Sequence, residues 1–331
     1  MKEGISRKNF IKTAAIGLAA LPIGNMVLGD ERKISKPLIS PAADGKISLN
    51  IFSKHLQWLN YTDMANQAAK MGFEGVDLTV RKGGHVLPER VNEDLPKALS
   101  AVKQAGLSIN AITTDIVDAD DKLAHDVLKA ASAAGIKNYR MGWYSYDKKL
   151  SPLQNVDQLK KRFAALSKVN ERYQIHGDYE HHTGRFGNSM WDLYEAIKDL
   201  SPQWIGCQLD IHHATIDGAM SWPINLDLIK DYVKSTTIKD FYWKKTDKGW
   251  DIANAPLGHG MVEFKKYFAQ LKSFNFKGPI IMHYEYPLGG ADQGAAKLTL
   301  PKEQVLASMQ ADVDTLKGWL KETGFMIFEP Y

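Results

Sequence analysis

Short apolar runs and amphipathic helical patterns alternate along most of this 331-residue chain. Eight runs have the length and the β-branched or aromatic content of buried strands, and a segment with helical periodicity follows each of them. The expected strands are 47–52, 75–80, 107–113, 138–142, 175–179, 205–209, 236–241 and 279–284. The expected helices are 61–71, 94–104, 121–134, 155–173, 190–200, 226–233, 262–274 and 302–323. Glycines stand one or two residues after the first three helices, as is typical of helix ends.

Eight strand-helix units predict an α/β fold in which eight parallel strands close into a (β/α)8 TIM barrel. A doubly wound open sheet is the alternative architecture. A glycine-rich dinucleotide loop is missing after the first strand, which counts against the nucleotide-binding form of that fold. No Pro/Ser-rich linker interrupts the alternation, so residues 47–331 are expected to form a single domain.

The first residues have the layout of an export signal. A basic stretch over 6–12 precedes an apolar, small-residue run over 13–29. It looks like a twin-arginine signal in which Lys8 stands at the second arginine position; a general-secretion signal or a retained anchor is the alternative. Gly17 and Pro22 break the run, so a stable membrane span is not expected after processing. We expect a signal over 1–32, a tether over 33–46 and a periplasmic protein.

Composition excludes several classes of function. Apolar residues make up 44% of the chain and charged residues 24%, as in an ordinary globular protein. The net charge of +4 includes the signal region, and no basic stripe indicates nucleic-acid binding. The single cysteine, Cys207, rules out an internal disulfide, and its apolar strand predicts a buried, unreactive thiol. Oligomeric state is left open, including a homo-oligomer.

Acids and histidines follow two consecutive strands at the same position. The stretch 177–184 contains Glu180 and His182, and the stretch 208–214 contains Asp210 and His213. Because chemistry in parallel α/β folds gathers at the carboxyl ends of strands, these four side chains should converge on one cavity. Carboxylates and imidazoles gathered in this way suit a divalent metal that polarises a substrate oxygen. Two polar surface loops are the alternative.

Further polar and aromatic residues stand near other expected strand ends. Lys239 is either an electrophile for a substrate oxygen or a solvated lysine, and Asp240 is expected to be structural. Arg140, in the fourth strand, and His85, in a glycine-containing loop, are candidate substrate contacts. Trp243 belongs to a group of aromatic residues near the carboxyl ends of the expected strands, which form the mouth of the barrel. This placement favours a sugar ligand because aromatic faces pack against sugar rings.

The order of these residues resembles the xylose isomerase-like barrels. The resemblance rests on four strand-end features and on the loop 256–260, and it covers nearly the whole chain after the signal. The four features are Glu180, Asp210-x-x-His213, Lys239-Asp240 and an acid on the last strand. That family includes sugar isomerases and epimerases, inosose dehydratases and metal-dependent abasic-site endonucleases. The chain looks like an exported, Bacteroidetes-type sugar phosphate isomerase/epimerase relative.

The resemblance implies that Glu180 and Asp210 are metal ligands, and the chain departs from the family elsewhere. Thr237 stands where the family has a histidine, and His283 stands where it has a glutamate, with Glu285 two residues later. One outcome is a rebuilt metal site of Glu180, Asp210, His283 and Glu285 holding Mn, Mg, Zn or Co. The other is a site too weak to hold an ion, whose polar groups bind sugar hydroxyls directly.

The resulting interpretation is a metal-assisted sugar isomerase or epimerase that removes a proton beside a sugar carbonyl. Its expected catalytic residues are Glu180, Glu285, Lys239 and His213. Its expected substrate-binding residues are His182, His85, Arg140 and Trp243. A keto-glycoside lyase or keto-sugar hydratase on the same site is one alternative, and a non-catalytic carbohydrate-binding barrel is another. A nuclease is disfavoured because no basic groove is indicated.

Overall fold

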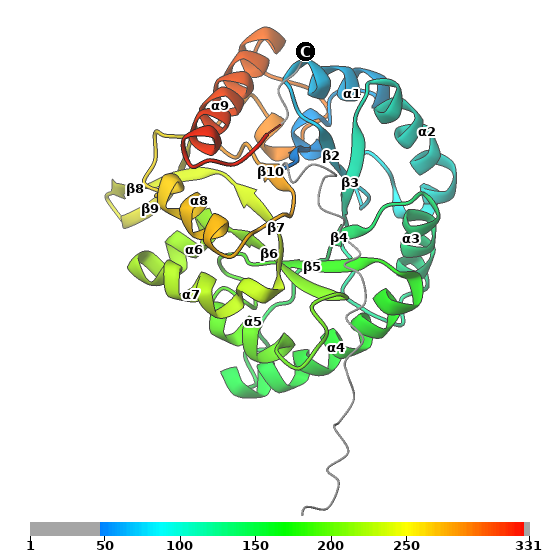
Figure 1. Cartoon of the computed structure of the whole chain (residues 1–331), viewed down its shortest axis with the longest axis vertical. Coiled ribbons are helices and arrows are strands. Elements are labelled where there is room, and N and C mark those ends of the chain that lie inside the picture. Colours follow the sequence, from blue (N-terminus) through cyan, green and yellow to red (C-terminus); the bar gives the residue numbers. More distant parts are fainter. Residues whose placement is uncertain (1–46, 328–331) are drawn as a thin grey trace, which may run out of the picture. The chain divides into compact units, whose positions relative to one another are not determined.

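The computed structural model describes residues 47–327, which form a closed parallel barrel surrounded by helices (Figure 1). The strands follow the order β1-β10-β7-β6-β5-β4-β3-β2 around the barrel. Their bounds are Leu49–Phe52 (β1), Gly75–Thr79 (β2), Ser108–Thr113 (β3), Asn138–Arg140 (β4), His176–Glu180 (β5), Ile205–Asp210 (β6), Val233–Ile238 (β7) and Ile280–Met282 (β10). The predicted (β/α)8 barrel is therefore confirmed, and the open-sheet alternative is wrong. The expected signal and tether lie outside the described residues.

Helices form the outer layer of the barrel (Figure 1). They are Tyr61–Lys70 (α1), Val91–Gln104 (α2), Lys122–Ala133 (α3), Pro152–Tyr173 (α4), Met190–Ile197 (α5), Ile211–Gly218 (α6), Trp222–Ile229 (α7), Phe264–Ser273 (α8) and Lys302–Glu322 (α9). The longest of them, α4, begins with a capping box, in which Ser151 and Gln154 satisfy each other's backbone N–H groups. Within residues 47–327, no helix is long and apolar enough to cross a membrane.

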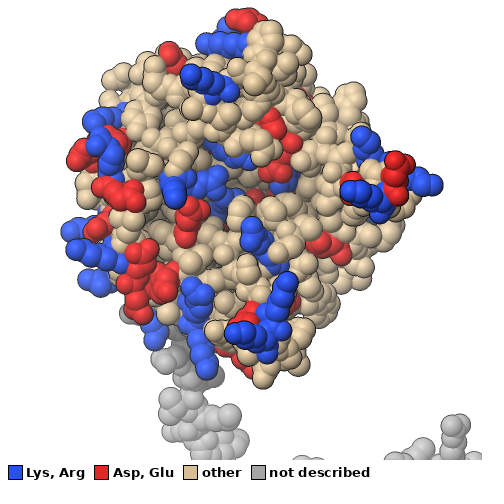
Figure 2. Space-filling view, turned by 180° about the vertical axis from the view of Figure 1, so that it is seen from behind, with Lys and Arg blue, Asp and Glu red and all other residues tan. Residues whose placement is uncertain are grey.

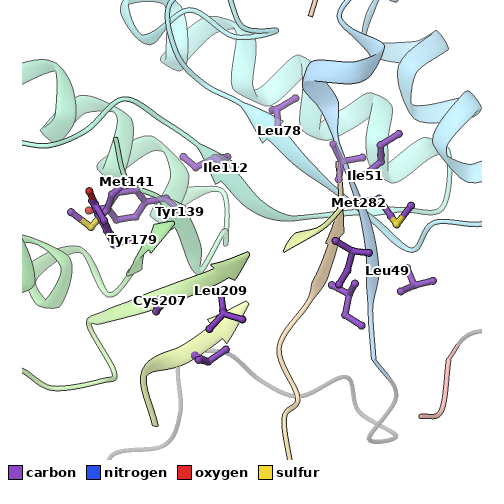
Figure 3. Packing of buried hydrophobic residues seen from close by; sticks show 14 of the residues in the cluster. Leu49, Ile51, Leu78, Ile112, Tyr139, Met141, Tyr179, Cys207, Leu209 and Met282 are labelled. Carbon is purple, nitrogen blue, oxygen red and sulfur yellow. The ribbon is translucent and has the colours of Figure 1, made fainter. Parts of the chain in front are cut away.

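Side-chain alternation separates an apolar layer from a polar lumen. Residues such as Leu49, Tyr179 and Leu209 belong to the buried hydrophobic core, part of which is drawn in Figure 3. Residues one position away point to the opposite face of each strand. Cys207 lies in the core, where burial raises the pKa of its thiol well above the ordinary value, as expected of an unreactive cysteine.

The lumen below the mouth is polar and closely hydrogen-bonded. Asp178 is fully buried, and its carboxylate accepts hydrogen bonds from Asn138 at 3.0 Å and Ser235 at 2.7 Å. His176 Nε2 lies 2.9 Å from the other oxygen of Asp178. Two positions later in the same strand, Glu180 points the same way and reaches the mouth. The strand thus places a structural acid deep in the lumen and a second acid at its opening.

The sequence did not reveal a β-hairpin inserted after β7. Strands β8 (Asp240–Thr246) and β9 (Gly249–Ala255) pair in antiparallel fashion and project beside α8 (Figure 1). The expected strand 236–241 is therefore divided, because β7 ends at Ile238 and β8 begins at Asp240. Asp240 is structural as expected, since its carboxylate accepts backbone N–H groups of the loop after the hairpin, Gly258 and Gly260 among them.

The carboxyl group of Glu74 is partly buried at the start of β1. Its Oε2 accepts the backbone N–H of Leu49, whereas its Oε1 is buried without a hydrogen-bond partner. Burial raises the pKa of Glu74 to about 7. Because the pKa is higher in the folded protein than in the unfolded chain, folding takes up a proton between about pH 4.5 and 7. Stability at this site is therefore present at low pH and is lost as the pH rises through that window.

We expect urea unfolding of the wild type to show a loss of up to about 3 kcal/mol from Glu74 as the pH rises from 5 to 8. Glu74→Gln cannot ionise but keeps an oxygen for Leu49. The stability difference between the two proteins should therefore change with pH in favour of the variant at pH 8. A difference that stays constant between pH 5 and pH 8 would show that Glu74 titrates normally.

Candidate functional site

The carboxyl ends of four neighbouring strands bring together the main predicted site residues. Glu180 ends β5 and Asp210 ends β6, while Lys239 follows β7 directly. His283 and Glu285 follow β10 at alternate positions, so both side chains face the cavity. Because the barrel is parallel, all five lie at the same end of it. Seen from behind, the molecule has a central hollow with acidic and basic atoms at its bottom (Figure 2).

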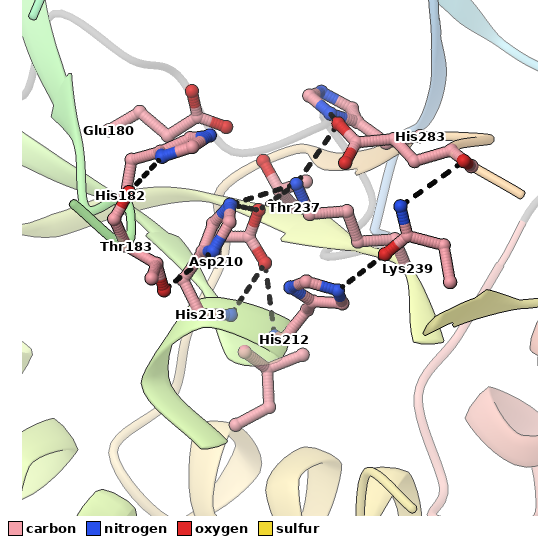
Figure 4. A network of polar contacts seen from close by, with 12 residues as sticks. Glu180, His182, Thr183, Asp210, His212, His213, Thr237, Lys239 and His283 are labelled. Atoms are coloured by element: carbon pink, nitrogen blue, oxygen red, sulfur yellow. Dashed lines mark hydrogen bonds and ion pairs between the residues drawn. The ribbon is translucent and has the colours of Figure 1, made fainter. Parts of the chain in front are cut away.

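The ammonium of Lys239 lies at the centre of this group (Figure 4). Its Nζ is 3.1 Å from Asp210 Oδ2, 3.0 Å from Glu285 Oε1 and 3.0 Å from His213 Nε2. Its side chain is only 3% exposed, so the alternative of a solvated strand-end lysine is wrong. Burial alone would lower the pKa of Lys239, but Asp210, Glu285 and Glu180 outweigh it and raise that pKa, so the lysine is a cation.

Hydrogen bonds outside the centre decide which ring nitrogen of His213 carries the proton. His213 Nδ1 lies 3.1 Å from Thr183 Oγ1, and that hydroxyl donates to Asp217 Oδ2 at 2.9 Å. The Thr183 oxygen is therefore free to accept a proton from Nδ1, which leaves a lone pair on Nε2. Burial and Lys239 hold the pKa of His213 well below its usual range. His213 thus presents a neutral acceptor to the ammonium.

Asp210 is positioned by the start of the next helix. It is the N-cap of α6, and its Oδ1 accepts the backbone N–H groups of His212 at 3.0 Å and His213 at 3.4 Å. This leaves Oδ2 directed at Lys239. Burial raises the pKa of Asp210, and the carboxylates of Glu180 and Glu285 add to that increase while Lys239 opposes it. Three acids thus share one small region, and each needs a positive neighbour to stay ionised.

Glu180 obtains its positive neighbour from the adjacent strand. Arg140 Nη1 donates to Glu180 Oε2, and the guanidinium stacks on Trp143 with its carbon 4.7 Å from the ring centre. Both members of this ion pair are at most 3% exposed. Burial would raise the pKa of Glu180, but Arg140, His283 and Lys239 together lower it. Glu180 Oε1 has no hydrogen-bond partner among the described residues, so an ionised oxygen remains available.

Glu285 is the most exposed of the acids in the group, with 24% of its side chain accessible. Burial would raise its pKa, but Lys239 and the ring of His283, whose Nδ1 lies 3.7 Å from Glu285 Oε1, hold the pKa of Glu285 well below its usual range. His283 stacks on Phe52 at 4.5 Å between ring centres, and burial lowers its pKa to about 4. Both ring nitrogens of His283 lack a well-formed hydrogen bond among the described residues. Glu285 is therefore an ionised base with access to a ligand.

The other predicted substrate contacts divide into two groups. His182 joins the site, since its ring lies 3.9 Å from that of His213 and 4.7 Å from that of Trp143, measured between centres. His85 lies apart from the acids, with Nδ1 3.3 Å from Thr79 Oγ1. Trp243 lies on the projecting hairpin, edge-to-face with Phe241.

Sequence reasoning missed several residues of the site. Lys54 follows β1 by two positions and interacts electrostatically with Glu285, and its place after a strand was the only signal for it. Asn254, on the hairpin, lies 3.0 Å from His212 Nε2 and donates to the backbone of Glu285 at 3.2 Å. A cavity of about 310 Å³ opens beside Lys54 and is lined also by Arg81 and Asp115. The mouth is therefore more basic than the strand motifs alone indicated.

A divalent metal is the cofactor that the sequence predicts, and part of the site has the right ligand types. Asp210, His212 and His213 place ligand atoms within 4.8 Å of one another and could hold an ion. In the arrangement described, however, most of their ligand atoms are already engaged, and His212 Nδ1 is the ring nitrogen of this cluster without a hydrogen-bond partner among the described residues. Asp210 Oδ2 and His213 Nε2 face Lys239, and His212 Nε2 faces Asn254. The residues as placed do not fit an ion unless Lys239 moves away.

Comparisons with known proteins agree with the barrel. The family model for the xylose isomerase-like TIM barrel matches residues 65–326. No curated protein matches the chain in a sequence search.

Solved structures with the same fold include three proteins named for sugar or dehydratase chemistry. A 3-keto-D-glucoside 4-epimerase from E. coli is 16% identical, with a TM-score of 0.58 over 82% of this chain and 99% of that one. A D-psicose 3-epimerase from Clostridium cellulolyticum H10 is 11% identical, with a TM-score of 0.62 over 83% and 99%. A Bacillus anthracis protein assigned as a 3-DHS dehydratase of petrobactin synthesis is 12% identical, with a TM-score of 0.58 over 82% and 99%. At these identities the likeness establishes the fold.

Proposed function

Because the chain belongs to the xylose isomerase-like TIM barrel family, we propose that it is a sugar isomerase/epimerase-type enzyme. Its reaction begins with removal of a proton from a carbon beside a sugar carbonyl. One observation carries this proposal: two carboxylates with lowered pKa values, Glu180 and Glu285, stand at one mouth around the cation Lys239. Ionised bases beside a fixed positive charge are what enolate chemistry requires.

The proposed step transfers one proton and one electron pair. A carboxylate oxygen of Glu180 or Glu285 takes the proton from the carbon next to the carbonyl. The C–H electron pair forms a carbon–carbon double bond, and the carbonyl electrons move onto oxygen. Lys239 stabilises the resulting enediolate oxygen by donating an N–H. Return of a proton to the other face of the same carbon gives an epimer, and return to the neighbouring carbon gives an isomer.

The remaining site residues are assigned supporting roles in this proposal. Arg140 keeps Glu180 ionised. The stacking of the Arg140 guanidinium on the Trp143 ring holds the arginine, and through it the carboxylate of Glu180, in position. His213 holds Lys239, and His182, whose ring packs against that of His213, contacts a sugar hydroxyl. His85 and Trp243 stay predictions as substrate contacts, because they lie away from the acids.

A divalent ion stays a prediction as the cofactor, as does its identity among Mn, Mg, Zn and Co. It would be held by Asp210 with His212 and His213, after Lys239 had moved, and Glu180, His283 and Glu285 are the other ligands that the sequence suggested. When bound, such an ion supplies Lewis-acid stabilisation of a substrate oxygen. Removal of the proton by Glu180 or Glu285 does not depend on which cation stands at Asp210.

A keto-glycoside lyase or keto-sugar hydratase is the second candidate. The fold neighbours include a protein named for 3-keto-D-glucoside chemistry and one assigned as a dehydratase, which favours this alternative. The same enediolate would expel a leaving group from the carbon beyond it, so the site needs no other base. A non-catalytic sugar-binding barrel is the third candidate, and it would not need ionised acids at the mouth.

The location and substrate form part of the proposal. The basic and apolar start of the chain supports export, by a twin-arginine-like route, to the periplasm. Free sugars, keto-sugars or glycosides are the proposed substrates there, and a homo-oligomer is compatible with the proposal.

The proposed function is tested by incubating the purified protein with a panel of keto-sugars, free aldoses and ketoses, and keto-glycosides. Products are separated by chromatography and weighed by mass spectrometry. We expect at least one substrate to give a product of unchanged mass and altered stereochemistry or carbonyl position. A product changed in mass by one water, or a released aglycone, would favour the hydratase or lyase. Saturable sugar binding without any product across the panel would favour the binding protein.

A further inference from the structure

We propose that the ammonium of Lys239 takes the place of a divalent ion, so that the site works with a cation supplied by the chain itself. This inference rests on the proposed function and deepens it by naming the electrophile. It starts from two positions at which the chain differs from the family. Thr237 stands in place of the expected histidine, and His283 stands in place of the expected glutamate. Those departures leave the ligand set incomplete, and Lys239 fills the centre that remains.

Three acceptor atoms surround the ammonium of Lys239. A lysine ammonium has three N–H donors and no acceptor. Around Nζ stand three acceptors at 3.0–3.1 Å, namely Asp210 Oδ2, Glu285 Oε1 and His213 Nε2. The tautomer of His213, set by Thr183, supplies the last of these as a lone pair. The contact with His213 is a hydrogen bond and those with Asp210 and Glu285 are ion pairs, so the buried charge of Lys239 is compensated on three sides.

The same contacts exclude a metal ion from the position. An ion would take the Asp210 and His213 atoms at about 2.0–2.2 Å, inside the distance at which Lys239 now lies. Two cations so close together would repel each other strongly in a buried site. Asp210 cannot offer its other oxygen instead, because Oδ1 accepts two backbone N–H groups of α6. The ammonium and a metal ion are thus alternatives for one set of ligands.

Glu180 has only one oxygen, Oε1, left for metal binding. Its Oε2 is paired with Arg140, and both groups are buried. Three of the four ligands suggested by the sequence (Glu180, Asp210 and Glu285) are therefore already in ion pairs with side-chain cations of the chain itself. A divalent ion would have to compete with these two cations, Arg140 and Lys239, for the carboxylates.

The arrangement also indicates how Lys239 meets a substrate. Glu285 is 24% exposed, whereas Asp210 is fully buried and His213 is 6% exposed. A sugar carbonyl oxygen entering from the mouth would replace Glu285, the accessible acceptor, on one N–H of Lys239. The displaced carboxylate would then stand next to the carbon beside that carbonyl, ready to take its proton. Lys239 and Glu285 would act as the electrophile and base of one step.

The test measures metal binding and isotope exchange separately. Wild-type protein is purified without chelator, analysed for metals, and titrated with Mn²⁺ and Zn²⁺ by calorimetry beside Lys239→Met. We expect the wild type to hold far less than one equivalent and Lys239→Met to bind Zn²⁺ at least about tenfold more tightly, because a cation leaves the ligand set. Lys234→Met is the matched control, since Lys234 lies near the start of β7, at the far end of the barrel from the site, and its loss should leave metal affinity unchanged.

Two results would overturn the inference: one equivalent of metal in the wild type, or loss of metal affinity in Lys239→Met. If Lys239→Met does not fold, the wild-type metal content and Lys239→Arg, which keeps the charge and should stay metal-poor, still decide the question. Carbon-bound hydrogen exchange in D₂O is then followed in chelator-treated wild type with the sugar panel. Exchange only after metal is restored would refute the inference and keep the proposed function. Absence of exchange under both conditions would refute the proposed function, while the titration still reports on Lys239.

Discussion

Glu180→Gln is expected to lower the turnover rate by about 10²–10⁴-fold while sugar binding persists. The amide keeps the shape of the side chain but cannot accept a proton from carbon. Glu180 is buried, holds one unpaired oxygen and has a lowered pKa, so it is ionised in the resting protein. Glu285→Gln is expected to have an effect of the same order. Steady-state rates and calorimetric sugar affinities measure the two quantities.

A matched control separates loss of the base from a general effect of the substitution. Glu171, on the exposed face of α4, is changed to glutamine in the same way and should leave the rate unchanged. If Glu180→Gln and Glu285→Gln both keep full turnover, proton abstraction by these acids is disproved. Full loss in only one of them would assign the whole reaction to one face of the substrate carbon, as a single-base isomerase requires.

Arg140→Met is expected to have the largest effect on stability, a loss of about 3–5 kcal/mol in the free energy of unfolding. The substitution leaves the buried carboxylate of Glu180 without its ion-pair partner and removes the stack on Trp143. Because Arg140 lowers the pKa of Glu180, its loss should also raise that pKa. The base would then become protonated at higher pH, so the acid limb of the pH–rate profile should shift to higher pH.

Urea unfolding and the pH dependence of kcat/KM measure the two effects of Arg140→Met. Arg162→Met is the control, because Arg162 also stacks on an aromatic ring, that of Tyr144, but lies on the half-exposed surface of α4. An Arg140→Met protein with wild-type stability and an unshifted acid limb would show that the ion pair does not set the state of Glu180. If Arg140→Met lowers the stability but leaves the acid limb of the kcat/KM profile at the same pH, Arg140 has a structural role alone.

The barrel could be predicted because each strand carries its own local signal. Apolar runs, helical periodicity and the glycines after helices occur at regular intervals, and they give the element order without any long-range information. The acids at the ends of β5 and β6 could be predicted equally well, since Glu180 and Asp210 are the last residues of buried strands. Side-chain alternation then placed His283 and Glu285 on the same face. All of these inferences need only the neighbouring residues.

The remaining features depend on contacts between distant segments. The hairpin β8–β9 was missed because its residues are mixed in polarity and exposed, so no periodic pattern marks them. The environment of Lys239 was left open between a solvated and an active lysine, because its burial is decided by Asp210, His213 and Glu285 from other strands. Its pairing with carboxylates also changes what the expected metal ligands can bind.

Hydrogen exchange at carbon in D₂O tests the central claim most directly. Chelator-treated wild-type protein is incubated with a sugar that it binds, and the recovered sugar is examined by NMR for deuterium beside the carbonyl. We predict deuterium at that carbon with the wild type and at least about a hundredfold slower incorporation with Glu180→Gln or Glu285→Gln. Recovery of the bound sugar with all its carbon-bound hydrogen, both before and after addition of Mn²⁺ or Zn²⁺, would contradict proton abstraction at this site.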